Sequence, residues 1–517
     1  MMRSPPPASP SEAEGLPAPV AASGDRHAGR FAFAGSLRTR AARGTIVNSA
    51  FTVALGLLTL LRGFVLAAYL SPADYGIWGV LAVSLSTLLF LKQAGVGDKF
   101  VQQQELDQEA AFQKAFTVEL AFTLASVALI AVAVPLLILI YNLPQLLWPS
   151  VVIAGTLLVS VLQAPLWIYY RRMEFVRQRA LQAVDPVVGF VVAVGLAIAG
   201  AGYWAFVGGM AAGTCAASAA AVWRSPFALR LRWERGAMGS YWSFSAPLLI
   251  AGAAGSVMAW SAALAAKLDL GVAAVGVITL AYTVASFTDS VDQLLTGALY
   301  PAICAVKDRA DVLYESLVKS NRLTLMWGVP FGIGVTLFCS DLVRFVLGER
   351  WHAAILLLQV YGITAAINHV GFNWTAYFRA IGRTRPIAVV TVAAAAIFVL
   401  GGIPLLVAFG LRGFAIGVAA QALGSLVLRA YYLQQLFEGF DFLRHAARAF
   451  LPTVPAAAVV LLARWVAPGD PRTLARALAE LVVYILIAAA ATWCLERRLL
   501  REAVSQLLAR PVAATPV

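Results

Sequence analysis

Two stretches of this sequence share one pattern of apolar runs, polar corners and glycines. The first is Ala67–Val101 and the second is Ala265–Pro301. In each, a polar corner precedes a helix-length apolar run that ends close to glycine and charged residues. A shift of 200 positions matches Gly76 with Gly276, Gln93 with Gln293, Gly97 with Gly297, Phe100 with Tyr300, and Lys92 with Asp292. The chain is therefore predicted to be built twice from one helical unit.

The apolar runs are long enough to cross a membrane, because a helix needs roughly 20 apolar residues to span a hydrocarbon core of about 30 Å. Hydrophobic residues make up 61% of the chain and charged residues 13%, whereas soluble domains carry about 25% charged residues. The sequence thus predicts an all-α integral membrane protein with about 14 transmembrane helices. They begin near Thr45, Tyr75, Phe116, Leu147, Leu181, Tyr203, Trp242, Val272, Leu323, Ala353, Ile387, Gly413, Ala446 and Thr473.

The duplication extends beyond the first pair of segments. Trp167–Phe175 matches Trp374–Gly382, and Gly202–Gly209 matches Gly410–Gly417. Each copy holds six predicted helices, so both copies enter the membrane from the same side. The pseudo-twofold axis is then expected along the membrane normal, as in transporters built from parallel repeats, with a cleft between the lobes that suits alternating access.

These features divide the chain into five predicted parts. We expect a disordered cytoplasmic tail, an N-lobe of helices 1–6, a cytoplasmic linker, a C-lobe of helices 7–12, and a last part with helices 13 and 14. Their residues are 1–43, 44–223, 224–240, 241–440 and 441–517, respectively.

Basic residues are distributed unevenly over the predicted loops. With the N-terminus in the cytoplasm, inside segments hold 29 of the 39 Lys and Arg residues. This asymmetry follows the positive-inside rule and places both termini in the cytoplasm. The net charge of +13 is therefore explained by orientation and by contact of the tail with anionic membrane lipids, and nucleic-acid binding is not expected.

Lys92 and Asp292 are opposite charges at equivalent places in the two repeats. Charges within spans are costly and mark pathways or ion pairs. We hypothesise that they form an inner gate, paired when the cavity opens outward. The alternative is that both side chains snorkel to water.

Two further charges lie within spans. Arg62 is suited to bidentate contact with a phosphate or carboxylate in the cleft, the alternative being a side chain that snorkels to the outer surface. Asp289 lies one helical turn before Asp292 and is a candidate for coupling transport to H⁺ or Na⁺. No other cofactor is expected, and the scattered cysteines do not have metal-ligand spacing.

Polar and stacking side chains within the predicted spans are candidates for binding sugar hydroxyls and rings. Hydrogen bonds between helices are the alternative role for each of them. The residues are Asn48, Gln163, Asn368, His369, Asn373 and Trp374.

The chain has none of the common motifs of catalysis. It contains no Walker A, HExxH or GxSxG motif and no metal-binding cysteine pair. Its predicted external connections are too short to hold a catalytic domain. A transporter is therefore predicted rather than an enzyme such as a membrane glycosyltransferase or polymerase.

Four segments in this order resemble the bacterial polysaccharide-transporter family, the Wzx-like oligosaccharide flippases of the multidrug/oligosaccharidyl-lipid/polysaccharide (MOP) exporter superfamily. They are AYLSPADYGIWGVL (Ala68–Leu81), GVGDKFVQ (Gly95–Gln102), GERW (Gly348–Trp351) and YFRAIGRTRP (Tyr377–Pro386).

The resemblance implies a MATE-like fold in the bacterial inner membrane. It also implies translocation of undecaprenyl-diphosphate-linked oligosaccharide units for lipopolysaccharide or exopolysaccharide biosynthesis, with a polysaccharide polymerase and chain-length machinery as partners. Arg62 and Lys92 are the cations that we assign by position to the cavity. A cation-coupled exporter of small molecules from the same superfamily is the alternative.

Overall fold

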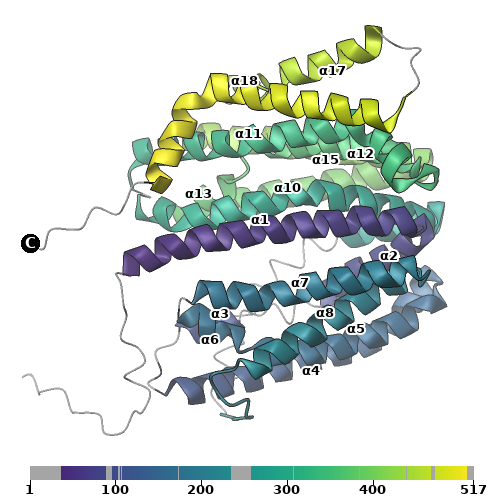
Figure 1. Ribbon diagram of the computed structural model, residues 1–517, viewed down its shortest axis with the longest axis vertical. Helices are drawn as coiled ribbons and strands as arrows, with labels where there is room; N and C mark the ends of the chain where they lie inside the picture. Colours follow the sequence, from purple (N-terminus) through teal and green to yellow (C-terminus); the bar gives the residue numbers. More distant parts are fainter. Residues whose placement is uncertain are drawn as a thin grey trace, which may run out of the picture.

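A computed structural model shows two helical bundles that lie against each other, with every regular element of the described residues helical. Figure 1 shows α1 and α10 where the bundles meet, the remaining helices of the first bundle on one side, and α17 and α18 at the opposite edge. The described residues are 37–88, 96–102, 105, 107–172, 174–234, 258–306, 308–383, 385–437, 439–466 and 472–508.

The N-lobe contains long helices interrupted by one short, broken span. In that span a 3₁₀ turn and Pro165 separate α5 from α6, because proline lacks the N–H that would continue the helix. The elements are α1 (Leu37–Tyr69), α2 (Pro72–Leu88), α3 (Val96–Gln102), α4 (Gln108–Tyr141), η3 (Pro144–Leu146), α5 (Leu147–Ser160), η4 (Val161–Gln163), α6 (Leu166–Arg171), α7 (Phe175–Ile198) and α8 (Trp204–Trp223).

The C-lobe repeats this order, with a second break between α12 and α13. Residues 258–270 are helical ahead of α10. The further elements are α10 (Val272–Ala305), α11 (Ala310–Leu342), η5 (Val343–Leu347), η6 (Glu349–Trp351), α12 (Ala354–Asn368), α13 (Trp374–Ala380), α14 (Arg385–Ile397), η7 (Phe398–Gly402), α15 (Ile403–Leu436), α16 (Phe442–Phe450), α17 (Val454–Val466) and α18 (Leu474–Leu508).

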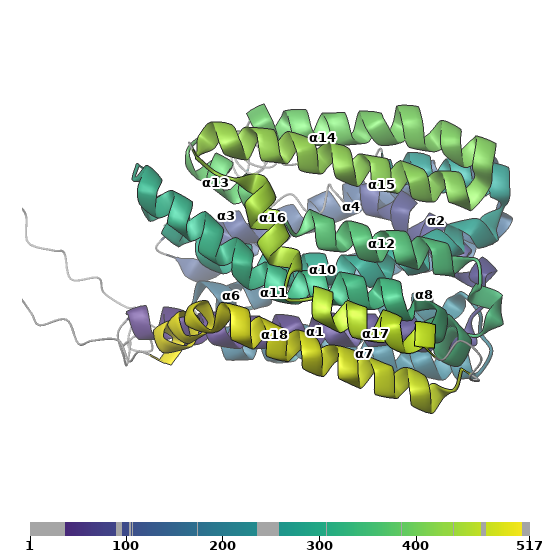
Figure 2. The same ribbon diagram turned by 90° about the horizontal axis from the view of Figure 1, so that it is seen from above.

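The number of candidate membrane spans in the described residues is smaller than the number that the sequence predicts. Among the described residues seven helices, or eight with the bent pair α16–α17, are long and apolar enough to span, whereas the sequence predicts 14. One helical stretch, Arg385–Leu436, covers two predicted spans and changes direction at Gly410, whose φ is +61°. Figure 2 shows α14 and α15 side by side. The predicted span that begins near Trp242 starts outside the described residues, which resume at residue 258.

The first helix begins earlier than the sequence predicts. α1 starts at Leu37, whereas residues 1–43 are predicted to be a disordered tail. Residues 37–43 contain only Leu, Arg, Thr and Ala, most of which favour helix, and the first glycine follows at Gly44. Residues 1–36 lie outside the described part of the chain.

The two lobes meet closely at the ends where α2 and α10 begin. A Cβ on Gly76 would lie 1.9 Å from the Val272 carbonyl oxygen, and one on Gly276 would lie 1.8 Å from that of Pro72. Any side chain at either glycine would force the helices apart. The matched glycines of the repeat are thus the points at which the two backbones touch.

A tryptophan from the C-lobe closes the same end of the molecule. Trp351 is fully buried, donates its indole N–H to the Ala67 carbonyl at 2.8 Å, and packs edge-on against Tyr75. Its neighbour Arg350 donates to the Ala68 carbonyl. The GERW segment therefore joins the C-lobe to the corner between α1 and α2.

An ion-pair cluster holds the last two helices against the C-lobe. The Arg464 guanidinium bridges Asp341 of α11 and Glu480 of α18 at 3.2 and 3.0 Å. Arg472 contacts the same two carboxylates, and its hydrogen bonds to Asp341 and Glu480 raise the pKa of the Arg472 guanidinium. Because both acids are buried, their pairing fixes where α17 and α18 dock.

Candidate functional site

Polar side chains from α1, η4, α7 and α8 meet inside the N-lobe. The Thr214 hydroxyl donates to Asp185 Oδ2 at 3.0 Å. The Gln163 amide donates to Ser218 Oγ at 3.4 Å and interacts with the Asp185 carboxylate. Arg62 lies within electrostatic range of Asp185. The cluster thus holds one carboxylate within electrostatic range of one cation, in a mostly apolar bundle.

Close packing of α7 against α8 brings the cluster together. A Cβ on Gly213 would lie 2.4 Å from the Asp185 carbonyl oxygen, and one on Gly189 would lie 3.0 Å from the Gly209 carbonyl oxygen. Small residues let transmembrane helices approach in this way. Asp185 also precedes Pro186, which cannot donate a backbone hydrogen bond within the helix.

Arg62 belongs to the helix that borders both lobes. α1 packs on α7 of the N-lobe and on α10 of the C-lobe, and a Cβ on the adjacent Gly63 would lie 3.3 Å from Thr283 of α10. The Arg62 and Asp185 residues are both half-buried. A guanidinium at this position is suited to bind a phosphate that enters between the lobes.

Sequence reasoning found Arg62 and Gln163 but missed Asp185. A signal was present, because Asp185 is the only charged residue between Leu181 and Tyr203. An ionisable residue in a span is by default a candidate for function.

The predicted sugar-binding residues of the C-lobe lie together at the break between α12 and α13. His369 and Asn373 are each 1% exposed, and Trp374 is also buried. The Asn373 amide donates to Ser320 Oγ at 2.8 Å. Asn368 is exposed, and its carbonyl accepts a hydrogen bond from Arg429 at 2.6 Å.

Two side chains of neighbouring helices satisfy the backbone of this break. Arg429 of α15 also donates to the Val370 carbonyl at 3.0 Å. Asn321 of α11 donates to the His369 carbonyl at 2.7 Å and accepts from the Gly371 N–H at 3.0 Å. Backbone groups freed by a break must be paired inside a membrane protein, and these contacts supply the pairing.

Replacing Arg429 with methionine is expected to destabilise the protein. The substitution keeps much of the side-chain length but leaves the Asn368 and Val370 carbonyls without this donor, at a cost of about 2–3 kcal/mol. Thermal unfolding of the purified protein in detergent should show a melting temperature lowered by several degrees. Arg412→Met on the exposed part of α15 is the control, and an equal loss there would contradict this role.

The remaining predicted site residues lie outside the described part of the structure. Lys92 is in an undescribed segment, and the side chains of Asn48, Asp289 and Asp292 are not described although their helices are. Within the described residues there is no group of three His, Cys, Asp or Glu side chains placed to hold a metal ion.

Comparisons with known proteins agree with the fold and the absence of enzymatic motifs. Residues 65–357 match the family described as "Polysaccharide biosynthesis protein". Lipopolysaccharide biosynthesis protein WzxC of Escherichia coli (strain K12) is 26% identical over 103 residues, which cover 20% of this chain and 21% of that protein. The chain thus spans about a fifth of the relative that it matches.

Two solved structures share the fold at low sequence identity. An inward-facing multidrug resistance MATE family transporter of the MOP superfamily aligns with a TM-score of 0.62 and 12% identity, over 76% of this chain and 98% of that one. The lipid II flippase MurJ in an inward closed conformation aligns with a TM-score of 0.61 and 13% identity, over 88% and 100%.

The chain therefore has the all-helical membrane-protein fold that is seen in this MATE transporter and in MurJ. The predicted MATE-like fold is confirmed. The chain belongs to the polysaccharide biosynthesis protein family.

Proposed function

We propose that this protein is a flippase that carries polyprenyl-diphosphate-linked oligosaccharide units across the bacterial inner membrane, with both termini in the cytoplasm. Family membership supports the substrate class. The observation that carries the proposal is Arg62, a cation within electrostatic range of Asp185 on the helix that packs against both lobes. The diphosphate is the one strongly anionic part of such a substrate, and a guanidinium is suited to bind it.

In this proposal Arg62, which lies within electrostatic range of Asp185 in the absence of substrate, forms an ion pair with the diphosphate when substrate enters. Gln163 and Thr214 would hold the Asp185 carboxylate while Arg62 is engaged. Asp185 then joins Asp289 as a candidate for coupling to H⁺ or Na⁺. Asn48, Asn368, His369, Asn373 and Trp374 remain candidates for contact with the sugars, and the polymerase and chain-length machinery remain candidate partners.

The contacts between the lobes suggest which conformation the protein adopts. With the termini inside, α2 and α10 begin at the outer face, so the Gly76–Gly276 contact and Trp351 close that face. Outward opening must then separate these contacts. Lys92 and Asp292 remain the proposed gate at the opposite face, and reversing both charges should restore what either single reversal destroys.

A strain that lacks this protein tests the proposal. Its lipids should contain an accumulated, complete lipid-linked repeat unit, and its surface polysaccharide should be missing, because flipping precedes polymer assembly outside. Mass spectrometry of extracted lipids and an assay of surface polysaccharide measure both. Unchanged lipid intermediates and polysaccharide would instead favour a cation-coupled exporter of small molecules, which the likeness to the MATE transporter also permits.

A further inference from the structure

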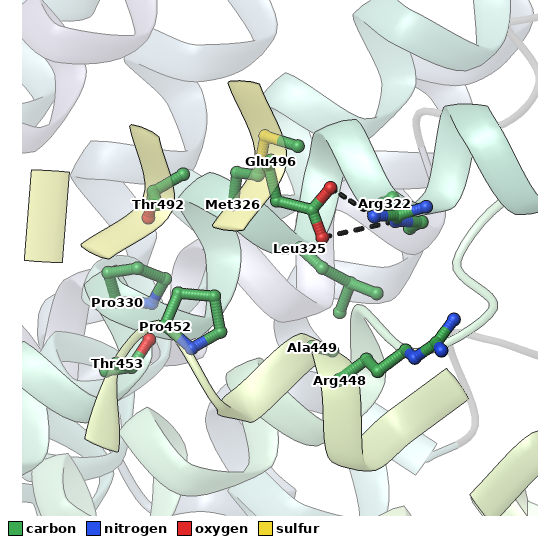
Figure 3. A pocket seen from close by; sticks show the side chains of 10 residues that line it. All are labelled: Arg322, Leu325, Met326, Pro330, Arg448, Ala449, Pro452, Thr453, Thr492 and Glu496. Carbon is green, nitrogen blue, oxygen red and sulfur yellow. Dashed lines mark hydrogen bonds and ion pairs between the residues drawn. The ribbon is translucent and has the colours of Figure 1, made fainter. Parts of the chain in front are cut away.

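A narrow pocket lies between α11, α16 and α18 (Figure 3). Figure 1 shows α18 at the edge of the molecule, away from the contact between the lobes. Its wall combines apolar and charged side chains, and Figure 3 shows Arg322 and Arg448 on one side and Thr453 and Thr492 on the other. The ten lining residues are Arg322, Leu325, Met326, Pro330, Arg448, Ala449, Pro452, Thr453, Thr492 and Glu496.

Prolines create the space for this pocket. Pro452 interrupts the chain between α16 and α17, and Pro455 follows within the first turn of α17. The two segments Arg444–Phe450 and Val454–Val466 are bent by 50° relative to each other. Because of this bend α16 and α17 do not form one straight helix, and the pocket lies at the bend.

The charged groups leave one positive charge at the pocket. The Arg322 guanidinium forms a two-point ion pair with the Glu496 carboxylate, so these two charges offset each other. Arg448 is exposed at the pocket. His445 lies within electrostatic range of both guanidinium groups, which places them near one another. One monoanionic group would balance the remaining charge.

A buried hydroxyl provides a second, independent sign of a ligand. Thr453 is 2% exposed and lines the pocket. Among the described residues its Oγ1 has no hydrogen-bond partner. An unpaired buried hydroxyl costs free energy, and buried polar groups normally find a partner. An oxygen of a bound molecule would supply it.

The depth of the pocket fits a lipid headgroup. The candidate membrane span of α18 begins at Leu474, and Glu496 lies 22 residues further on. At about 1.5 Å per residue this is roughly 33 Å, compared with a hydrocarbon core of about 30 Å. With the proposed orientation, the pocket lies at the boundary between acyl chains and headgroups of the inner leaflet.

We propose that this pocket binds the phosphate of a monoanionic phospholipid, such as phosphatidylglycerol, of the inner leaflet. Arg448 pairs with the phosphate, Thr453 donates to an ester oxygen, and an acyl chain lies along Leu325 and Met326. The position on the far side of α11 from the N-lobe distinguishes this lipid from a transported substrate (Figure 1). The proposal depends on the orientation of the chain and not on flippase activity.

Native mass spectrometry of the purified full-length protein tests the site, with phosphatidylglycerol and phosphatidylcholine as probes. Wild type should retain one phosphatidylglycerol in preference to phosphatidylcholine. Arg448→Gln should weaken this binding about tenfold, the effect of losing one charged contact, and Thr453→Val should weaken it less. Arg444→Gln, an exposed arginine of the same helix outside the pocket, is the control and should bind as wild type does.

Three results would overturn the proposal. Equal retention of phosphatidylcholine, whose phosphate charge is balanced by its own quaternary ammonium, would remove the need for a headgroup with a net negative charge. An equal loss of binding in Arg444→Gln would show a diffuse basic surface rather than a site. Displacement of the lipid by millimolar inorganic phosphate would show a site for free anions. Thermal melting without added lipid verifies that each variant folds, and Thr453→Val tests the pocket without changing its charge.

Discussion

Joining α2 to α10 by a disulfide, through Gly79→Cys with Thr279→Cys, is expected to abolish translocation. A Cβ on Gly79 would lie 3.3 Å from the Thr279 Cβ, close to the 3.5–4.5 Å that disulfides adopt, on the order of a few tenths of an ångström short. The bond would hold together the ends that the proposed mechanism must separate. Accumulation of lipid-linked oligosaccharide in cells, and its return to normal on reduction, would measure the effect.

The controls for this experiment are a cysteine-free background and the two single cysteine variants. The native cysteines Cys215, Cys304, Cys339 and Cys494 are first replaced by alanine, so that only the designed pair can form. Each single cysteine variant should transport under oxidising conditions, because it cannot join the lobes. Undiminished transport by a fully cross-linked protein would contradict alternating access through this contact.

Arg62→Ala is the second substitution for which we expect a large effect. Loss of a guanidinium contact with a diphosphate costs about 2–3 kcal/mol, which corresponds to a loss of affinity of roughly 30-fold or more. Lipid-linked oligosaccharide should accumulate and surface polysaccharide should fall. Arg62→Lys should keep part of the activity, because the charge remains while the bidentate geometry is lost. Arg177→Ala, in an exposed pair with Glu174, should have little effect.

A double variant separates binding of substrate from support of the fold. If Arg62 only neutralises Asp185, then Arg62→Ala leaves a carboxylate without its cation, and adding Asp185→Asn should restore transport. If Arg62 contacts the diphosphate, the double variant stays inactive although it melts at the temperature of wild type. Recovery of transport would therefore refute the substrate contact.

Much of the fold could be predicted from local features of the sequence. Long apolar runs predict membrane helices, and the 200-residue shift that matches Gly76 with Gly276 predicts the repeated order of elements. The number of spans could not be fixed in the same way. Breaks such as that at Gly410 and the π-helical segment η7 depend on which neighbouring groups satisfy the backbone, which apolar periodicity does not encode.

The candidate site could also be predicted only in part from the sequence. Arg62 and Gln163 stand out in the sequence as polar residues within apolar runs, but 101 positions separate them. Their meeting around Asp185 depends on the packing of α7 on α8, and on the rotation of α1. The polar C-lobe residues appear equally suited to sugars in the sequence, yet in the structure they lie at a helix break paired by Arg429 and Asn321.

The sequence by itself determined that this protein spans a membrane and belongs to the polysaccharide biosynthesis protein family, and it predicts two related halves, because hydrophobicity and spacing are local properties of the chain. Only the tertiary structure decided which polar groups meet. An α-helix has 3.6 residues per turn, so the rotation of the helix about its own axis decides where each side chain points. A small change in helix packing therefore directs the same side chain to lipid, to the cleft or to another helix. Asp185, Trp351 and Thr453 acquire the roles described here from packing alone.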